Sequence, residues 1–223
     1  MTLAAALSPL LARPVPVAID PPIAELFERV GVVMSFGAEE EIYAQDDETD
    51  LVYCVLSGSV RAVRLLSDGR RQVGGFYYRG DLFGLETGPA HRSSAETLTE
   101  TKVLAVRRSA LRHYGEVGER LERMLWRATG EELSVVRDHM LLLARKNAVE
   151  RVAGFLDDTA HRLGGAWVDL PMARQDIADY LGLTIETISR MLTQLQGEHI
   201  VQFDGCRRFR ISAPGRLAAL VAA

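Results

Sequence analysis

The sequence predicts an α+β protein with three successive parts: an antiparallel β-roll, a long helix and a C-terminal winged helix-turn-helix. Three patterns carry this prediction. Apolar residues recur with a period of two over much of residues 31–107, which is typical of strands. Between residues 117 and 144 they recur at steps of four and three, which is typical of one long helix. Near Gly182, two shorter helical patterns are joined by a tight turn.

The composition is that of an ordinary soluble protein, with 48% hydrophobic and 25% charged residues among 223. The formal net charge of −4, taken alone, argues against nucleic acid as a partner. Two cysteines exclude a four-cysteine metal or iron–sulfur site within one chain. The sequence has no apolar run of membrane-spanning length and no basic secretory leader, so we expect a cytoplasmic protein.

We expect four segments along the chain. Residues 1–20, which are rich in proline and alanine, form a flexible N-terminal segment. Residues 21–116 form a sensor-like β-roll domain, which begins with a short helix at 23–27. The long helix follows at 117–144, and the winged helix-turn-helix domain occupies 145–223.

The β-roll is predicted from short strands that end at glycine turns. We expect strands at residues 51–56, 60–65, 72–78 and 102–106. The Asp68-Gly69 pair between the second and third of these strands is the strongest hairpin signal in the chain. Short strands with this punctuation indicate an antiparallel barrel or roll.

The helix at 117–144 carries a heptad-like seam with two polar positions. A helix of this length spans about 40 Å, which is long for a small domain unless it packs on another long helix. We therefore expect a parallel homodimer; the alternative is that the helix lies on its own β-roll. The seam has a polar position at Glu132, and the residues expected at the dimer interface are Leu121, Leu125, Ala128, Val135, His139 and Leu142.

A helix-turn-helix is predicted from residue 173 to about 197. The first helix ends at Gly182, a residue that readily adopts the left-handed conformation of a helix end. Thr184 caps the second helix, whose buried stripe is Ile188, Leu192 and Leu195. The link of about three residues is too short for antiparallel packing and favours the angled pair of this motif.

The burial pattern leaves Ile185, Glu186, Ser189 and Arg190 facing outward at the start of the second helix. In helix-turn-helix proteins this part enters the major groove, where Arg binds guanine and Glu accepts from cytosine. The alternative is that Glu186 and Arg190 form only a solvent-facing pair. Strands at 200–203 and 206–211 form a wing, joined by the Asp204-Gly205 turn. Phosphate contacts are expected from Arg174, Thr184, Thr187, Arg207, Arg208 and Arg210.

On these motifs, the chain resembles the CRP/FNR superfamily of bacterial transcription regulators from residue 23 to the C-terminus, and within it the FixK-like branch. Residues 186–190, Glu-Thr-Ile-Ser-Arg, match the Glu-x-x-Ser-Arg signature of the FNR and FixK side of the superfamily. Residues 175–187 are especially similar to FixK, and residues 56–60, 68–72 and 80–84 resemble the superfamily's cyclic-nucleotide-binding-type roll.

The resemblance implies an activator or repressor that binds double-stranded DNA as a homodimer and contacts RNA polymerase. The expected site is a palindrome with TTGA-type half-sites, read by Glu186, Ser189 and Arg190. At Ile185, where cAMP-responsive members have Arg, an apolar side chain suits a thymine methyl.

The nucleotide cassette of the superfamily is only partly present. Arg92 and Ser93 are retained, but Asp81 stands where the resemblance implies a ribose-binding Glu, and Val136-Arg137 stand where adenine contacts are expected. We therefore expect no obligatory small-molecule effector and no cofactor; the alternative is a ligand-gated regulator whose roll binds a nucleotide or another small molecule. Iron–sulfur sensing is excluded because no cysteine precedes Cys54, and the five scattered histidines disfavour haem.

Cys206 is the candidate for a redox switch, because the adjacent Arg207 and Arg208 stabilise a thiolate. The alternative is that it only fills space in the hairpin. The sequence shows no motif of catalytic carboxylates, Ser/His/Asp residues or phosphate-binding glycines, so we expect no enzymatic activity. The charge is also uneven: residues 145–223 hold ten basic and nine acidic residues, a net +1, which leaves −5 on the rest.

Overall fold

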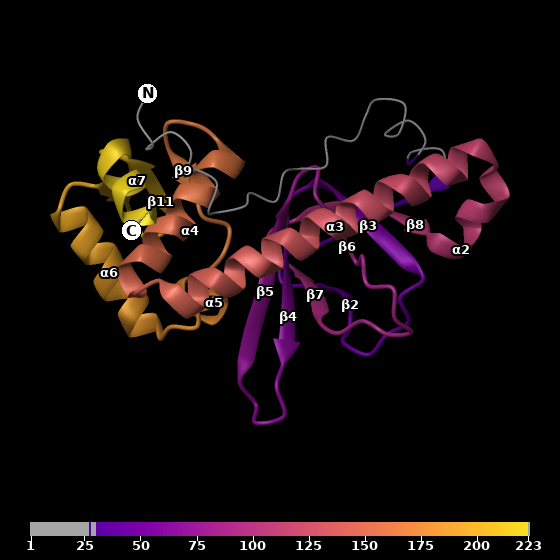
Figure 1. Cartoon of the computed structure of the whole chain (residues 1–223), viewed down its shortest axis with the longest axis horizontal. Helices are drawn as coiled ribbons and strands as arrows, with labels where there is room; N and C mark the ends of the chain where they lie inside the picture. Colours follow the sequence, from indigo (N-terminus) through magenta and orange to yellow (C-terminus); the bar gives the residue numbers. More distant parts are fainter. Residues whose placement is uncertain (1–26, 28–29, 223) are drawn as a thin grey trace. The chain divides into compact units, whose positions relative to one another are not determined.

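The computed structural model describes residues 27, 30–222 of the chain (Figure 1). The flexible segment expected at 1–20 and most of the short helix expected at 23–27 lie outside the described residues. The described chain divides into two compact units, one ending at Leu133 and the other beginning at Ser134. None of the described helices is both long and apolar enough to cross a membrane.

The first unit contains the predicted antiparallel β-roll, built from two four-stranded sheets. One sheet has the order β1-β8-β3-β6, with strands β1 (Val32–Phe36), β8 (Thr101–Arg107), β3 (Leu51–Ser57) and β6 (Leu82–Phe83). The other has the order β2-β7-β4-β5, with strands β2 (Glu41–Tyr43), β7 (Ser94–Thr97), β4 (Ser59–Leu65) and β5 (Arg71–Tyr78). The four predicted strands correspond to β3, β4, β5 and β8, and every pairing is antiparallel.

The β3–β4 turn requires glycine for two reasons. Gly58 has a φ of 87°, which side chains other than glycine rarely adopt. A Cβ at this position would also lie 2.4 Å from the Glu100 carbonyl oxygen. The turn therefore brings β4 directly beside the start of β8.

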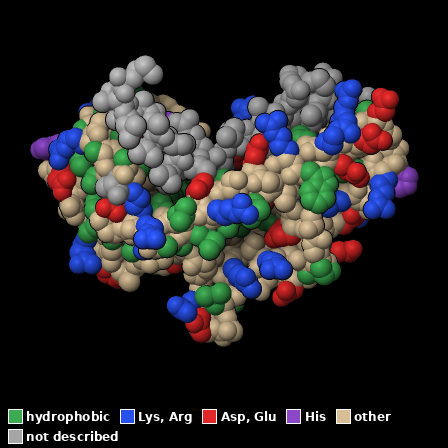
Figure 2. All heavy atoms as spheres, viewed as in Figure 1, with side chains coloured by type: hydrophobic (Ala, Val, Ile, Leu, Met, Phe, Trp, Pro, Cys, Tyr) green, Lys and Arg blue, Asp and Glu red, His purple; other side chains and the backbone are tan. Residues whose placement is uncertain are grey.

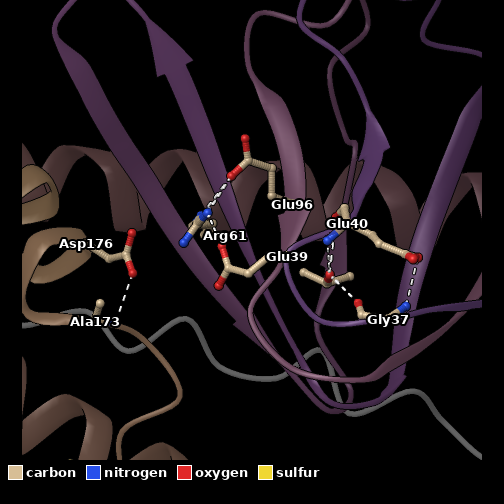
Figure 3. Close-up of polar contacts among 8 residues, drawn as sticks. Gly37, Glu39, Glu40, Arg61, Glu96, Ala173 and Asp176 are labelled. Atoms are coloured by element: carbon tan, nitrogen blue, oxygen red, sulfur yellow. Dashed lines mark hydrogen bonds and ion pairs between the residues drawn. The ribbon is translucent and has the colours of Figure 1, made fainter.

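A nearly buried guanidinium joins the strands of the second sheet. Arg61 on β4 lies opposite Glu96 on β7, and its Nη2 is 2.7 Å from carboxylate oxygens of both Glu96 and Glu39 (Figure 3). The Arg61 side chain is only 9% exposed. Since an unpaired buried charge is costly, the two carboxylates are needed to hold this arginine inside.

The long helix extends from Glu116 to Arg145 (α3), within one residue of the predicted bounds. It follows α2 (Arg108–Leu111) and the 3₁₀ helix η2 (Arg112–Tyr114). Leu121, Leu125 and Ala128 are almost fully buried in the hydrophobic core that α3 forms with the roll. These three residues, expected at a dimer interface, therefore belong to the interior of their own chain.

The second unit contains the predicted helix-turn-helix and wing. Its helices are α4 (Ala148–Leu163), α5 (Arg174–Leu181), α6 (Ile185–Gly197) and α7 (Pro214–Ala222). Its sheet has the order β10-β11-β9, with β10 (Val201–Asp204), β11 (Arg208–Ile211) and β9 (Val168–Asp169). The wing hairpin is thus confirmed, with a third strand in addition. Cys206 and Arg207, expected on the second strand of the wing, lie in the turn instead.

Candidate nucleic-acid interface

The turn between α5 and α6 is set by three consecutive residues. Gly182 has a φ of 62° in the left-handed region and ends α5. The Leu183 N–H donates to the Ala178 carbonyl at 3.0 Å, which closes the turn. The Thr184 hydroxyl accepts from the Thr187 N–H at 3.2 Å and caps α6. The predicted tight link and cap are both confirmed.

The start of α5 is fixed by a carboxylate from within the helix. The Ala173 N–H donates to Asp176 Oδ2 at 2.9 Å (Figure 3). Asp176 is only 2% exposed, so its carboxylate is part of the packed interior. This bond pairs one of the backbone N–H groups that a helix start leaves unsatisfied and makes Arg174 the first helical residue.

Helix α6 has one buried and one exposed face. Ile188, Leu192 and Leu195 are at most 4% exposed and form the predicted buried stripe. Glu186 and Arg190 are exposed at the start of the helix, and Ile185 is 38% exposed. The structure therefore brings together, on the outer side of the first turns, the side chains predicted to read bases.

Short polar contacts position several of these side chains. Arg174 Nη1 donates to the Ser189 Oγ at 3.2 Å, which links the start of α5 to α6. Arg190 Nη2 donates to the Thr187 Oγ1 at 3.3 Å, one turn back along α6. Both guanidiniums thus donate to neutral hydroxyls, and the carboxylate of Glu186 lies near the guanidinium of Arg190 without a direct ion pair being formed among the described contacts.

Glu186 is an acceptor at the positive end of α6. Its own backbone N–H, the Thr184 hydroxyl and the nearby Arg190 all hold the pKa of the Glu186 carboxyl below its usual range. A fully ionised carboxylate accepts hydrogen bonds and donates none. This protonation state suits an amino group on the partner, such as cytosine N4.

The three wing arginines lie in different environments. Arg208 is 3.7 Å from an Asp204 oxygen and 3.9 Å from an Asp169 oxygen, so it is partly neutralised. Arg210 Nε donates to Gln202 Oε1 at 2.8 Å. Arg207 is exposed in the turn, and within the described part of the chain it has no ion-pair partner.

Trp167 was missed by the sequence analysis. The Cζ atoms of Arg208 and Arg210 lie 5.5 and 5.0 Å from its ring centroid, so both guanidiniums make cation–π contacts with the ring. It immediately precedes β9, whose register places it across from Arg210. The available signal was an aromatic residue beside an alternating Val-Asp pair, but two residues are too few to reveal a strand.

The sequence analysis also missed Arg151, which hydrogen-bonds to backbone carbonyls at the C-terminal ends of α3 and α5. Its guanidinium donates to three carbonyl oxygens: Leu143 at 2.7 Å, Lys146 at 2.9 Å and Leu181 at 3.0 Å. Leu143 lies in the last turn of α3, Lys146 follows the end of that helix, and Leu181 is the last residue of α5. Near this point, His139 Nε2 lies 3.0 Å from the Tyr180 carbonyl oxygen and its ring stacks on Tyr180. These contacts join the last turns of α3 to the helix-turn-helix.

The exposed apolar side of α3 is offset by one residue from the predicted seam. Of the predicted residues, Val135 and His139 are partly buried and Leu142 is only 8% exposed. Figure 2 shows hydrophobic side chains exposed along α3. The exposed set includes Trp126, Leu133, Val136 and Met140, which are 71%, 50%, 46% and 63% exposed. Trp126, Leu133 and Met140 are spaced by seven residues; we call these four residues the outer stripe.

Of the nucleotide cassette residues, Asp81 is occupied by a contact of the roll itself, and the neighbouring His91 is buried. Asp81 is 6% exposed and its Oδ2 accepts from the Tyr78 N–H at 2.7 Å. His91 is 1% exposed, stacks on Tyr43 at 3.7 Å between ring centroids, and lies 3.1 Å from Glu86 Oε2. Arg92 is exposed. The described residues contain no group of three or more His, Cys, Asp and Glu that could hold a metal ion.

The two cysteines differ in access. Cys206 is exposed in the wing turn, whereas Cys54 on β3 is buried. Burial, together with the nearby Asp81, raises the pKa of the Cys54 thiol to about 12. Of the two, Cys206 is therefore the one that a solvent oxidant reaches.

Comparisons with known proteins match two parts of the chain. Residues 33–116 match the family profile of the cyclic nucleotide-binding domain, and residues 150–220 match that of the Crp-like helix-turn-helix domain. These two matches cover the β-roll and the helix-turn-helix with its wing.

The chain is similar over most of its length to three regulators. It is 42% identical over 191 residues to the nitrogen fixation regulation protein FixK of Azorhizobium caulinodans, covering 83% of this chain and 77% of that protein. It is 43% identical to FixK of Rhizobium meliloti, covering 85% and 87%. It is 42% identical to the transcriptional activatory protein AadR of Rhodopseudomonas palustris, covering 89% and 85%. The solved structure of FixK2 from Bradyrhizobium japonicum matches with a TM-score of 0.82 at 47% identity, covering 87% of this chain and 98% of that one.

Proposed function

The chain belongs to the FixK-like branch of the CRP/FNR family of DNA-binding transcription regulators, and from this premise we propose that it binds a TTGA-type palindrome as a cytoplasmic homodimer without an obligatory effector. The observation that carries the proposal is the outer side of α6, where Glu186 and Arg190 are exposed above a fully buried apolar stripe. RNA polymerase is the second macromolecular partner we propose for the regulator.

Base reading is assigned to four residues of α6. Arg190 donates to guanine, Glu186 accepts from cytosine, and Ile185 contacts a thymine methyl. Ser189 supplies a hydroxyl that Arg174 already orients at 3.2 Å. Because these side chains are positioned by α6 and its cap, little ordering is required when DNA binds.

Backbone contacts are assigned to residues around α6 and to the wing. Arg174, Thr184 and Thr187 lie beside the base-reading residues, and Arg207 extends from the exposed wing turn. Arg208 and Arg210 add positive charge from β11, although Asp204 and Asp169 offset part of it at Arg208. We expect Arg207 to contribute most of the wing's phosphate binding.

Dimerisation is assigned to the outer stripe of α3. Its four apolar side chains are between 46% and 71% exposed, and two copies packed in parallel would cover them. Of the residues first expected at this interface, Leu121, Leu125, Ala128 and Leu142 are buried in their own chain and offer little area to a second copy. Two-fold symmetry of such a dimer is what a palindromic DNA site requires.

Effector independence is supported by the filled interior of the roll. Stacked rings of Tyr43, Tyr53 and Phe83 occupy the core there, with centroid distances between 5.0 and 6.2 Å. Asp81 is occupied by the Tyr78 N–H, and Val136 and Arg137 are both exposed. A ribose that used Asp81 would have to displace the Tyr78 N–H first.

The test is selection of bound sequences from random double-stranded DNA, using the purified full-length protein with and without cAMP, cGMP and c-di-GMP. We expect enrichment of a TTGA-type palindrome under all four conditions and no heat of nucleotide binding by calorimetry. Enrichment that depends on one nucleotide would contradict effector independence. Uniform recovery of scrambled sequences would contradict sequence-specific binding itself.

A further inference from the structure

The contacts between the long helix and the roll are mostly apolar, but one is polar. The Tyr77 hydroxyl on β5 donates to Glu132 Oε1 on α3 at 3.0 Å, and both side chains are partly buried. This contact joins residues 55 positions apart in the chain. It accounts for the polar position in the predicted seam, because Glu132 finds its partner within its own chain.

The phenol of Tyr77 is held by other aromatic rings. Its ring centroid lies 5.4 Å from that of Phe83, which in turn lies 5.0 Å from that of Tyr53. Burial raises the pKa of Tyr77, and the nearby Glu132 carboxylate adds to the shift, so the hydroxyl keeps its proton. The roll therefore presents a fixed O–H donor to α3.

Holding Glu132 adds a polar contact to the apolar ones that orient α3 about its axis. Successive residues of a helix are about 100° apart, so Leu133 turns away when Glu132 faces the roll. Leu133 is 50% exposed and belongs to the outer stripe. The Tyr77–Glu132 bond extends, to the next turn of α3, the orientation that the buried Leu121, Leu125 and Ala128 give to the helix, and it keeps Leu133 on the exposed side.

We propose that Tyr77 is a positioning residue that takes the place of an effector: its phenol, anchored in the roll, holds Glu132 and sets the rotation of α3 needed for dimerisation and DNA binding. This inference rests on the proposed function, since it assigns the regulation of the same DNA-binding dimer.

The first experiment replaces the phenol and then returns it as a free molecule. We expect Tyr77→Ala in the full-length protein to bind the palindrome about 10-fold more weakly, because the bond to Glu132 is lost. Added phenol should restore much of the affinity, whereas benzene, which fills the same space without a hydroxyl, should not. Fluorescence anisotropy with labelled palindromic DNA measures all three states. Equal restoration by benzene and phenol would overturn the proposal, as would an unchanged affinity of Tyr77→Ala.

The second experiment avoids a cavity, so it decides the matter if Tyr77→Ala fails to fold. We expect Tyr77→Phe and Glu132→Leu each to weaken the dimer and DNA binding about 10-fold, and Glu132→Gln, which keeps an acceptor, to stay close to wild type. Tyr114→Phe removes an exposed hydroxyl and is the matched control. Wild-type affinity in Tyr77→Phe would overturn the proposal. If the wild type itself were monomeric or did not bind the palindrome, the proposed function would have failed instead.

Discussion

In the helix-turn-helix unit, the charged side chains at the start of α6 are exposed and held by neutral hydroxyls. In the roll, the charged side chains of Arg61, Asp81 and Glu86 contact groups of the same unit. Exposed charged side chains are available to an external partner, whereas Arg61, Asp81 and Glu86 are already engaged by groups of the roll. This difference agrees with the proposal that DNA is recognised by the helix-turn-helix unit.

The largest effect is expected where the pairing inside the roll is broken. Arg61→Ala should lower the free energy of unfolding by about 3 kcal/mol, because the carboxylates of Glu39 and Glu96 then lose the nearly buried guanidinium that pairs with both. Urea unfolding measures this value. Arg64→Ala, an exposed arginine on the same strand, is the control and should change stability by less than about 0.5 kcal/mol. Equal effects of the two substitutions would show that the roll does not depend on its internal pairing.

The second prediction removes an outward charge. Arg190→Ala should weaken binding to the palindrome by about 1–3 kcal/mol and relax the preference at one base pair, while leaving stability nearly unchanged. Binding titrations on single-base variants of the site measure both effects. Arg120→Ala, which removes an exposed arginine from α3, is the charge-matched control. A uniform loss over all DNA sequences would assign Arg190 to the backbone instead of to a base.

Local signals made much of this architecture predictable. The helix-turn-helix depends on Gly182, Thr184 and a buried stripe within a few turns of the chain, so its elements could be predicted from neighbouring residues. The orientation of α3 could not. The helix has apolar side chains on two adjacent faces, and periodicity alone does not tell an intramolecular face from an intermolecular one.

The side-chain contacts that orient α3, α4 and α5 could not be predicted from the sequence. Tyr77 and Glu132 are 55 residues apart, and Arg151 reaches carbonyl groups of two other helices. Such pairings depend on tertiary structure and leave no periodic trace. The two polar positions of the predicted seam, Glu132 and His139, were the visible sign, because each is paired with a group of its own unit.

The third prediction concerns two arginines of the wing hairpin. Arg208 lies close to carboxylates, whereas Arg207 is exposed in the turn. Arg207→Ala should reduce the slope of log affinity against log salt by about 1, as expected for one lost phosphate contact. Arg208→Ala should reduce it less, because Asp204 and Asp169 already offset its charge. Titrations at several salt concentrations measure the slopes. A larger change for Arg208 than for Arg207 would mean that DNA draws Arg208 away from its carboxylates.

The fourth prediction uses pH to test the contact between α3 and the helix-turn-helix. Burial lowers the pKa of His139, Arg151 lowers it further, and the Tyr180 carbonyl opposes the shift. Because the unfolded chain binds the proton more readily, the stability contributed by neutral His139 is present above the unfolded pKa of about 6.5 and is lost as pH falls toward the lower folded value. Thermal unfolding between pH 7.5 and 5 should therefore show a smaller loss for His139→Gln than for wild type. The exposed His113 is the control, and His113→Gln should behave like wild type.

The smallest effect is expected at Cys206, which is exposed in the wing turn beside Arg207. Peroxide oxidation of the thiol adds a polar, acidic group close to where DNA phosphates are expected, so wild-type affinity should fall a few-fold and recover with dithiothreitol as long as oxidation stops at a reversible stage. Cys206→Ser should keep its affinity under the same treatment. The buried Cys54, whose pKa is raised to about 12, remains a thiol in both proteins and serves as an internal control. Equal losses of DNA affinity in wild type and Cys206→Ser would place the oxidation at another residue. The wing of the helix-turn-helix unit would then not be redox-sensitive.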